Sequence, residues 1–293
     1  MNNKIPKSIS VLIEGLSQKK SYKPSEVVQI VKKANITPKD IMPWADFNHP
    51  KADSYGRKLV HKSDNFEIMV MSWVPGDISA IHDHGFATWG AVQIFGENEH
   101  AIFKIEGNQI STLSRTNFNY GQIVGVEHNL IHQMGNMTNE NILTLHIYGL
   151  EEIKENVTGD ANLYDIENSK IQIINGGVFY NLPSNEIAEV IEGPKADFPT
   201  RLRDIVELGN RLSLANPASK RIETIKQKIQ SGEYCDLFNS YILNVKNSEG
   251  KIQNPIQWKI LKKEIAAANK FLNIDNLLEL LEESTFCKLE ELV

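Results

Sequence analysis

The sequence predicts a mainly β protein, a jelly-roll barrel with short helices before it and a helical extension after it. Between residues 55 and 182, short apolar runs alternate with glycine and asparagine, as strands and tight turns do. Outside this region the apolar residues recur at helical spacing. Many short strands joined by turns are typical of an antiparallel barrel or a double-sheet jelly roll, so we expect that architecture in the middle of the chain.

Short helices are expected before the barrel. Ile9, Leu12 and Leu16 share one face of a helix, because their spacing follows the helical period. Further on, Thr37 suits an N-cap, and Pro38 suits the first helical position, where no backbone donor is needed. These signals place helical structure in the segment that leads into the first strand.

Strands and then helices are expected over the rest of the chain. The clearest strand signals lie at residues 66–74, 91–95, 100–105 and 142–148, with a later strand pair at 170–174 and 177–182. Helical patterns follow at residues 202–208, 222–229 and 256–265. We therefore expect a barrel domain with its N-terminal helices at residues 1–187 and a helical extension at 188–293.

Composition excludes several classes of partner. Of the 293 residues, 41% are apolar and 23% charged, and the net charge is −6. We expect no nucleic-acid partner, because the sequence has no concentrated basic patch, and no membrane partner, because no apolar run is long enough to span a bilayer. With no signal-peptide pattern and only Cys235 and Cys287, we expect a cytoplasmic protein with free thiols.

Two histidines near the middle of the chain are candidate metal ligands. His82 and His84 are separated by one residue, and on a strand such side chains point the same way, while Asp83 points to the other face. Neighbouring imidazoles on an inward face form a ready pair of ligands. A lone histidine is more often a structural residue, so the spacing around the pair is what favours a ligand role.

That spacing resembles the cupin superfamily. Gly76 lies five intervening residues before His82, and Gly96 closes the following strand, as in the first cupin motif. Residues 121–136 resemble the second cupin motif, with His132 at the ligand position. The resemblance implies a cupin double-stranded β-helix, which is a jelly-roll barrel, with a metal held by three histidines.

Two positions decide the composition of the ligand set. His128 competes with His132 as third ligand, and the cupin spacing favours His132. The position that most cupins fill with a ligating glutamate holds Trp89, five residues after His84, and tryptophan offers no lone pair to a metal. Three neutral imidazoles suit iron(II), and they also suit zinc, so the ligands alone leave the reaction open. The remaining histidines, with no partners in register, are expected to be structural or exposed: His49, His61 and His100.

Loss of the glutamate and three further stretches resemble the cysteine dioxygenase family. The segment YGRKLV resembles the family segment that clamps the substrate carboxylate, which implies substrate-binding roles for Tyr55 and Arg57. A tryptophan-glycine stretch then leads into the paired histidines. The segment TLHIY resembles the family's Ser-x-His-x-Tyr strand, with Thr144 in place of serine, and implies catalytic roles for Thr144, His146 and Tyr148. The resemblance covers about residues 55–149.

The resemblance implies an Fe(2+) enzyme that adds both atoms of O2 to a small-molecule thiol, with L-cysteine giving cysteine sulfinate. Arg57 favours cysteine over 3-mercaptopropionate. Two alternatives stay open: a cupin metalloenzyme for another thiol or a non-thiol substrate, and a non-catalytic cupin that senses a ligand. The expected barrel domain has no cysteine, so Tyr148 cannot be crosslinked as in animal members, and Gly149 and Leu150 replace a serine-proline pair.

The helical extension has no counterpart in compact family members. Its apolar stripes are typical of core packing, and we assign no chemistry to them. Three roles stay open for these helices: docking on the barrel, forming a homodimer interface, or binding another partner.

Overall fold

A computed structural model describes residues 5–50, 53–154, 156–180, 182–215, 220–229, 231–247, 249–273, 275–279 and 281. The chain forms two compact units. The first comprises Met1–Ile102, Arg115–Asp165 and Ile171–Ile191, and the second comprises Phe103–Ser114, Ile166–Lys170 and Glu192–Val293. The chain passes between the units several times, and the domain boundary expected between residues 187 and 188 stays a prediction.

The first unit begins with three helices, α1 (Lys7–Leu16), α2 (Pro24–Ala34) and α3 (Pro38–Ile41). In α2 the carboxylate of Glu26 accepts a hydrogen bond from the Lys23 backbone N–H at 2.9 Å, and the helix ends at Asn35, whose φ of 51° is left-handed. At α3 the Asp40 carboxylate accepts from the Thr37 N–H at 2.9 Å. The predicted helix start at Thr37 and Pro38 is therefore confirmed.

A five-stranded sheet forms the centre of the first unit. In spatial order its strands are β1 (Gly56–Lys62), β2 (Phe66–Trp73), β8 (Ile142–Gly149), β3 (Trp89–Phe95) and β6 (Ile123–Glu127). Every neighbouring pair is antiparallel. The three central strands are buried along their whole length, which explains why their sequences read as continuous apolar runs.

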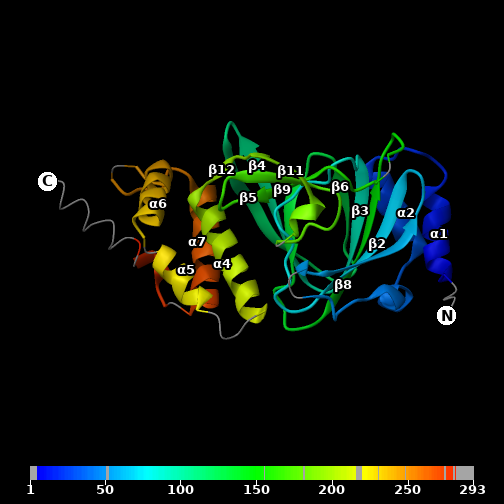
Figure 1. Cartoon of the computed structure of the whole chain (residues 1–293), viewed down its shortest axis with the longest axis horizontal. Coiled ribbons are helices and arrows are strands. Elements are labelled where there is room, and N and C mark those ends of the chain that lie inside the picture. Colours follow the sequence, from blue (N-terminus) through cyan, green and yellow to red (C-terminus); the bar gives the residue numbers. More distant parts are fainter. Residues whose placement is uncertain are drawn as a thin grey trace. The chain divides into compact units, whose positions relative to one another are not determined.

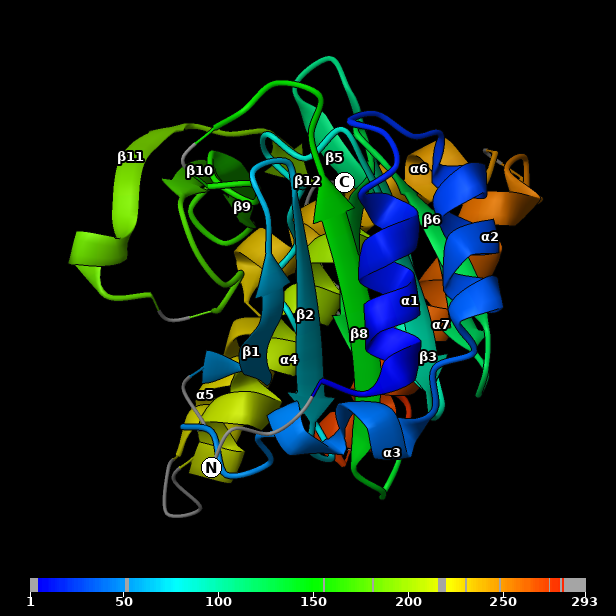
Figure 2. The same cartoon turned by 90° about the vertical axis from the view of Figure 1, so that its right-hand side faces the viewer.

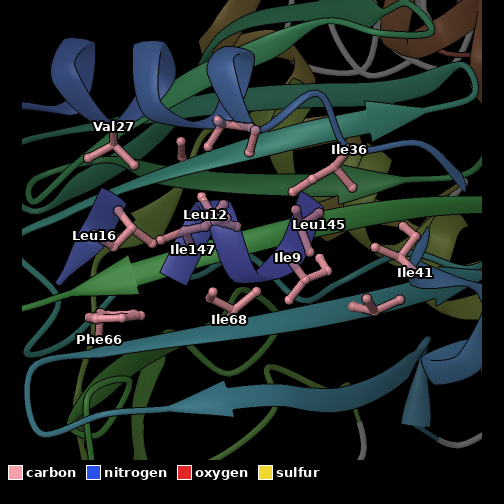
Figure 3. Packing of buried hydrophobic residues seen from close by; sticks show 14 of the residues in the cluster. Ile9, Leu12, Leu16, Val27, Ile36, Ile41, Phe66, Ile68, Leu145 and Ile147 are labelled. Carbon is pink, nitrogen blue, oxygen red and sulfur yellow. The ribbon is translucent and has the colours of Figure 1, made fainter. Parts of the chain in front are cut away.

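The two faces of this sheet have different neighbours. Figure 2 shows α1 and α2 lying across one face, with α1 beside β8 and α2 on the side of β3 and β6. There the apolar face of α1 meets apolar strand residues, and Figure 3 shows Leu12 beside Ile147. Because side chains alternate along a strand, His146 and Tyr148 point to the opposite face. That opposite face belongs to a second core cluster, which contains Tyr148.

Two smaller sheets complete the β structure. One has the order β12-β5-β4-β7, and its strands are β4 (Asn98–Glu106), β5 (Gln109–Phe118), β7 (Ile131–Gly135) and β12 (Lys195–Ala196). The tip of the β4–β5 hairpin, residues 103–114, belongs to the second unit, where β12 pairs with the start of β5 in parallel. The other sheet has the order β11-β10-β9, and its strands are β9 (Ala161–Asp165), β10 (Lys170–Ile174) and β11 (Ile187–Glu192).

The prediction of a strand at residues 177–182 is wrong. Strand β10 forms as predicted but pairs with β9 and β11. The backbone of Val178 is used elsewhere: its N–H donates to the Tyr55 hydroxyl at 3.1 Å, and its carbonyl accepts from the Ala80 N–H at 3.1 Å. Backbone groups that are already hydrogen-bonded to other segments cannot also pair with a neighbouring strand. Residue 181 lies outside the described residues.

The second unit is mainly helical (Figure 1), with α4 (Phe198–Ala215), α5 (Arg221–Ile229), α6 (Gly232–Val245) and α7 (Pro255–Leu272). Three of these helices were predicted, and α6 was not, although Tyr234, Phe238, Tyr241 and Val245 form its buried stripe at helical spacing. Cys235 in α6 is buried and forms no disulfide within the described part of the chain, and Cys287 lies outside the described residues. Within the described part of the chain, no helix has the length and apolar character needed to cross a bilayer.

Candidate metal centre

Backbone pairing brings the candidate ligands together. His82 and His132 form an isolated antiparallel bridge, in which the His82 N–H donates to the His132 carbonyl at 3.0 Å and the His132 N–H donates back at 2.9 Å. His84 follows two residues after His82, in a segment between β2 and β3 that is not a regular strand. The first and second histidine motifs of the sequence therefore meet across one bridge.

The three side chains converge on one point. One ring nitrogen from each of His82, His84 and His132 lies within 4.8 Å of the others. The ring of His132 is centred 4.6 Å from that of His82 and 4.7 Å from that of His84. All three are buried, and no carboxylate among the described residues joins the group. These are the three histidines that the sequence suggested.

Burial keeps the three imidazoles neutral. Loss of solvent lowers the pKa of His82 to about 4 and holds the pKa of His84 and His132 well below the usual range, with the neighbouring imidazoles adding to the effect for these two. A neutral imidazole has one nitrogen with a free lone pair, which is the form that binds a metal.

Unpartnered nitrogens test whether a metal fits here. Both ring nitrogens of His84 and Nε2 of His132 are buried without a hydrogen-bond partner among the described residues. His82 Nδ1 donates to the Ala80 carbonyl at 2.9 Å, so its Nε2 keeps the free lone pair. Buried polar atoms normally have partners, and three convergent lone pairs suit a divalent ion such as iron or zinc. The residues therefore fit a metal ion.

A chain of hydrogen bonds runs along β8 beside the histidines. His146 Nδ1 lies 2.8 Å from the Tyr148 hydroxyl, and His146 Nε2 lies 2.8 Å from Thr144 Oγ1. The chain continues to Trp73, whose indole Nε1–H donates to Thr144 Oγ1 at 2.9 Å. The Tyr148 ring is centred 5.4 Å from the ring of His84, so the chain ends next to the candidate metal site.

Trp73 fixes one end of this hydrogen-bonded chain. Its indole N–H donates to Thr144 Oγ1, which has a second lone pair and a hydroxyl hydrogen, so Thr144 can accept from His146 Nε2 or donate to it. In the arrangement in which Thr144 donates, His146 carries its proton on Nδ1 and donates to the Tyr148 oxygen, and the Tyr148 O–H can then donate into the pocket. Burial lowers the pKa of His146 to about 3 and raises the pKa of Tyr148, so both groups stay neutral.

A narrow cavity lies against these groups. The cavity has a volume of about 40 Å³, and the residues that line it include the three candidate ligands, Trp73, His146 and Tyr148. Tyr55 and Arg57, expected to bind substrate, lie in its wall. A cavity of this size suits a small molecule.

Arg57 is the cation of the cavity wall. No lysine or other arginine is among the described residues that line it. Its guanidinium Nη2 donates to Thr158 Oγ1 at 3.2 Å. The carboxylate of Asp83, also in the wall, accepts from the Asn162 N–H at 2.9 Å and from its side-chain amide at 2.7 Å. Hydrogen bonds from Asn162 thus hold the Asp83 carboxylate, and Arg57 is the group in the wall that suits an anionic substrate.

Tyr55 has a packing role in addition to its place in the wall. Its ring stacks on Trp73 with a centroid distance of 4.6 Å. Its hydroxyl oxygen accepts the backbone hydrogen bond from Val178, and burial raises its pKa to about 12. The contact ties the segment around Val178 to the pocket.

Trp89 does not point into the pocket. It packs with Tyr22 in the helix-covered core, at a ring centroid distance of 5.1 Å. In the strand register Gly90 lies opposite Tyr148, so Gly90 is the β3 residue on the pocket face. An added Cβ at Gly90 would lie 2.3 Å from the Ile147 carbonyl oxygen, so a larger side chain does not fit. The expectation that Trp89 stands at the ligand position is wrong, although the ligand set stays free of carboxylates.

His49 and His100 are buried and His61 is partly exposed, in line with the expectation that these histidines are structural or exposed. His49 Nε2 pairs with the Asp77 carboxylate at 2.9 Å, and His100 Nε2 lies 2.9 Å from His132 Nδ1. Both pairings join residues far apart in sequence, which spacing could not reveal. His128 lies outside the metal group, with its Nδ1 3.0 Å from the Ala87 carbonyl.

The chain is similar to one protein family and to several solved structures. The family model for cysteine dioxygenase type I matches residues 2–151. A structure of TT1209 from Thermus thermophilus is 16% identical, with a TM-score of 0.32, and the match covers 39% of this chain and 98% of that one. An uncharacterised conserved protein with a double-stranded β-helix domain from Klebsiella pneumoniae is also 16% identical, with a TM-score of 0.31, over 39% of this chain and 90% of that one. At these TM-scores nothing about activity follows from the two structures.

The β architecture with its inward histidines defines a cupin with a candidate metal site. The chain belongs to the cysteine dioxygenase type I family, because the family model spans slightly more than half of its 293 residues. The match ends at residue 151, and Thr158, Ala161, Gly176 and Val178 of the cavity wall come from the chain beyond it.

Proposed function

We propose that the protein is a mononuclear iron(II) thiol dioxygenase that converts L-cysteine into cysteine sulfinate. The observation that carries the proposal is the convergence of three buried, neutral imidazoles beside a buried tyrosine in a chain of this family. The reaction adds both atoms of O2 to the sulfur, so it balances without an external reductant.

His82, His84 and His132 would hold the iron. When bound, iron(II) supplies open coordination positions where a thiol is deprotonated and O2 is activated. The protein contributes a small cavity beside these histidines, which holds the substrate next to the iron site. Because the ligands are neutral, the site keeps the positive charge of the ion, which favours a thiolate over a thiol.

Arg57 binds the substrate carboxylate in this proposal. Its guanidinium is the cation of the cavity wall, and a planar guanidinium suits a carboxylate through two parallel hydrogen bonds. Thr158 holds the guanidinium through the 3.2 Å hydrogen bond from Nη2. A thiol without a carboxylate should therefore be a poor substrate.

Tyr148 orients the oxidised sulfur group. Its hydroxyl hydrogen is free for the pocket when His146 donates to its oxygen, so it can donate a hydrogen bond to the oxygen atoms that arrive on sulfur. The hydroxyl stays protonated because burial raises its pKa. Tyr148 acts in this scheme as a fixed donor.

Oxygen uptake with a panel of thiols tests the proposal. We expect iron(II)-loaded protein to consume one O2 per L-cysteine with cysteine sulfinate as product, and to turn over cysteamine, which lacks a carboxylate, poorly. Sulfinate from 3-mercaptopropionate alone would overturn the assignment of cysteine and keep the thiol dioxygenase. No oxygen uptake with any thiol, in protein that holds iron, would overturn both.

Two alanine variants locate the metal. His132→Ala should abolish iron retention and turnover, because it removes one of the three ligands. His128→Ala is the matched control, since His128 lies close in sequence but outside the metal group, and it should retain iron. Iron retained by His132→Ala and lost by His128→Ala would reverse the ligand assignment.

A further inference from the structure

His100 is a buried histidine that contacts a candidate metal ligand directly. It lies on β4, beside β7 in the same sheet, and β7 carries His132. Its Nε2 is 2.9 Å from Nδ1 of His132. The ring of His100 stacks on Phe118 with a centroid distance of 4.6 Å and an interplanar angle of 24°. Packing therefore fixes the ring in the orientation that reaches His132.

Two arrangements of protons satisfy this contact. In the first, His132 carries its proton on Nδ1 and donates to Nε2 of His100, which leaves Nε2 of His132 with a free lone pair. In the second, His100 donates to Nδ1 of His132, and the proton of His132 is then on its Nε2. Only the first arrangement offers a metal a lone pair at Nε2, the buried nitrogen that has no other partner among the described residues.

The other two ligands are held differently. Nδ1 of His82 faces the carbonyl of Ala80, which can only accept, so His82 has one possible tautomer. Neither ring nitrogen of His84 has a partner among the described residues. His132 is thus the ligand whose outer partner is itself an imidazole, able to accept or to donate.

We propose that His100 is a positioning residue for the metal, which accepts the Nδ1 hydrogen bond of His132 and holds it in the metal-binding tautomer. An acceptor behind a ligating histidine also makes its metal-binding nitrogen more basic, which strengthens the bond to the ion. The inference rests on the proposed function in one respect, that the three histidines bind a metal, and it does not depend on the substrate.

Iron binding by metal-free protein tests this role. Iron(II) affinity is measured anaerobically by equilibrium dialysis with metal analysis, without any thiol present. His100→Phe keeps a ring to stack on Phe118 but cannot accept a hydrogen bond, and it should bind iron about 10- to 100-fold more weakly. His100→Gln should recover most of the affinity, because its amide oxygen can accept from Nδ1 of His132.

A matched control separates this role from general packing. His61→Phe makes the same change at a histidine whose ring also lies near a phenylalanine, Phe66, at 5.4 Å, and it should leave iron affinity unchanged. Thermal unfolding of the metal-free variants reports structural damage independently. If His100→Phe does not fold, His100→Asn replaces it, because its shorter amide does not reach Nδ1 of His132.

The outcomes distinguish this inference from the proposed function. Wild-type affinity in His100→Phe would overturn the positioning role and leave the dioxygenase proposal intact. A loss of affinity that His100→Gln does not restore would also overturn it, because the loss would then come from packing. If wild type and His132→Ala retain iron equally, the three-histidine site itself is refuted.

Discussion

The two faces of the central sheet differ in chemistry although both are buried. Successive side chains of strand β8 point alternately to the two faces. Leu145 and Ile147 face the N-terminal helices and belong to an apolar cluster, whereas Thr144, His146 and Tyr148 face the cavity and form a hydrogen-bonded chain. All five side chains are almost fully buried. Burial by itself therefore does not distinguish the structural face from the functional one.

The difference lies in how each face satisfies its groups. On the helix-covered face, removing apolar side chains from water stabilises the fold by about 1.5–3 kcal/mol per large side chain. On the cavity face, buried polar groups cost free energy unless they are hydrogen-bonded. Thr144 and His146 have hydrogen-bond partners, while both ring nitrogens of His84 and Nε2 of His132 have none among the described residues. A site is marked by buried donors or ligands that converge without partners.

The largest effect on stability is expected on the helix-covered face. Ile147→Ala should lower the free energy of unfolding by about 2–5 kcal/mol, because it leaves a cavity between β8 and α1. Urea denaturation measures this loss, and the iron stoichiometry of the folded variant should stay that of wild type. Loss of iron from a folded Ile147→Ala protein would show that the two faces are not separable.

The largest effect on activity is expected on the cavity face. Tyr148→Phe removes a fixed hydrogen-bond donor and should lower kcat about 100- to 1,000-fold. Iron affinity should change little, since Tyr148 is not a ligand in this scheme. Steady-state oxygen uptake checks the prediction, and a variant with the kcat of wild type would remove Tyr148 from the catalytic groups.

A smaller effect is expected at the far end of the hydrogen-bonded chain. Trp73→Phe keeps an aromatic ring to stack on Tyr55 but removes the N–H that donates to Thr144 Oγ1. One hydrogen bond contributes about 0.5–1.5 kcal/mol, so we expect kcat, measured by steady-state oxygen uptake, to fall by up to about tenfold.

The same substitution on the other face is its control. Trp44 packs against the helix-covered core, so Trp44→Phe should leave kcat unchanged. Equal losses of kcat in the two variants would mean that Trp73 acts through packing.

The smallest effect concerns pH and the buried pair of His49 and Asp77. Burial alone lowers the pKa of His49, but its hydrogen bonds to Asp77 and to the Pro50 carbonyl together raise it above the usual value. A raised pKa means that the pair stabilises the fold fully below about pH 6.5, the unfolded value, and that this stabilisation is lost as the pH rises through the folded pKa.

Unfolding measurements on His49→Gln test this sign. The advantage of wild type over the variant, taken from urea denaturation, should be larger at about pH 6 than at about pH 8. An advantage that grows with pH would show that His49 is held neutral in the folded protein.

Sequence patterns predicted those features that depend on short spacing. The helix start at Thr37 follows from local hydrogen-bonding chemistry, and the shared face of Thr144, His146 and Tyr148 follows from the period of a strand. The close approach of His82 and His132 was inferred from a resemblance, since about fifty residues of spacing carry no geometric information by themselves.

Features that depend on register or on pairing across the fold were missed. Trp89 and Gly90 are neighbours in sequence, and only the pairing of β3 with β8 decides which of them faces the cavity. The bond from Trp73 to Thr144 and the contact of His100 with His132 join strands far apart in the chain. The apolar stripe of α6, by contrast, is present in the sequence at helical spacing.

The amino-acid sequence by itself determined which residue types lie at which local spacing, and so several of the strands, most of the helices and a candidate set of ligands. Tertiary structure decided which nitrogens are left without partners, to which face of the sheet each residue points, and which groups His100 and Trp73 contact. The physical reason is that local spacing fixes side-chain direction within an element, whereas hydrogen-bond partners and burial arise only when separate elements pack together.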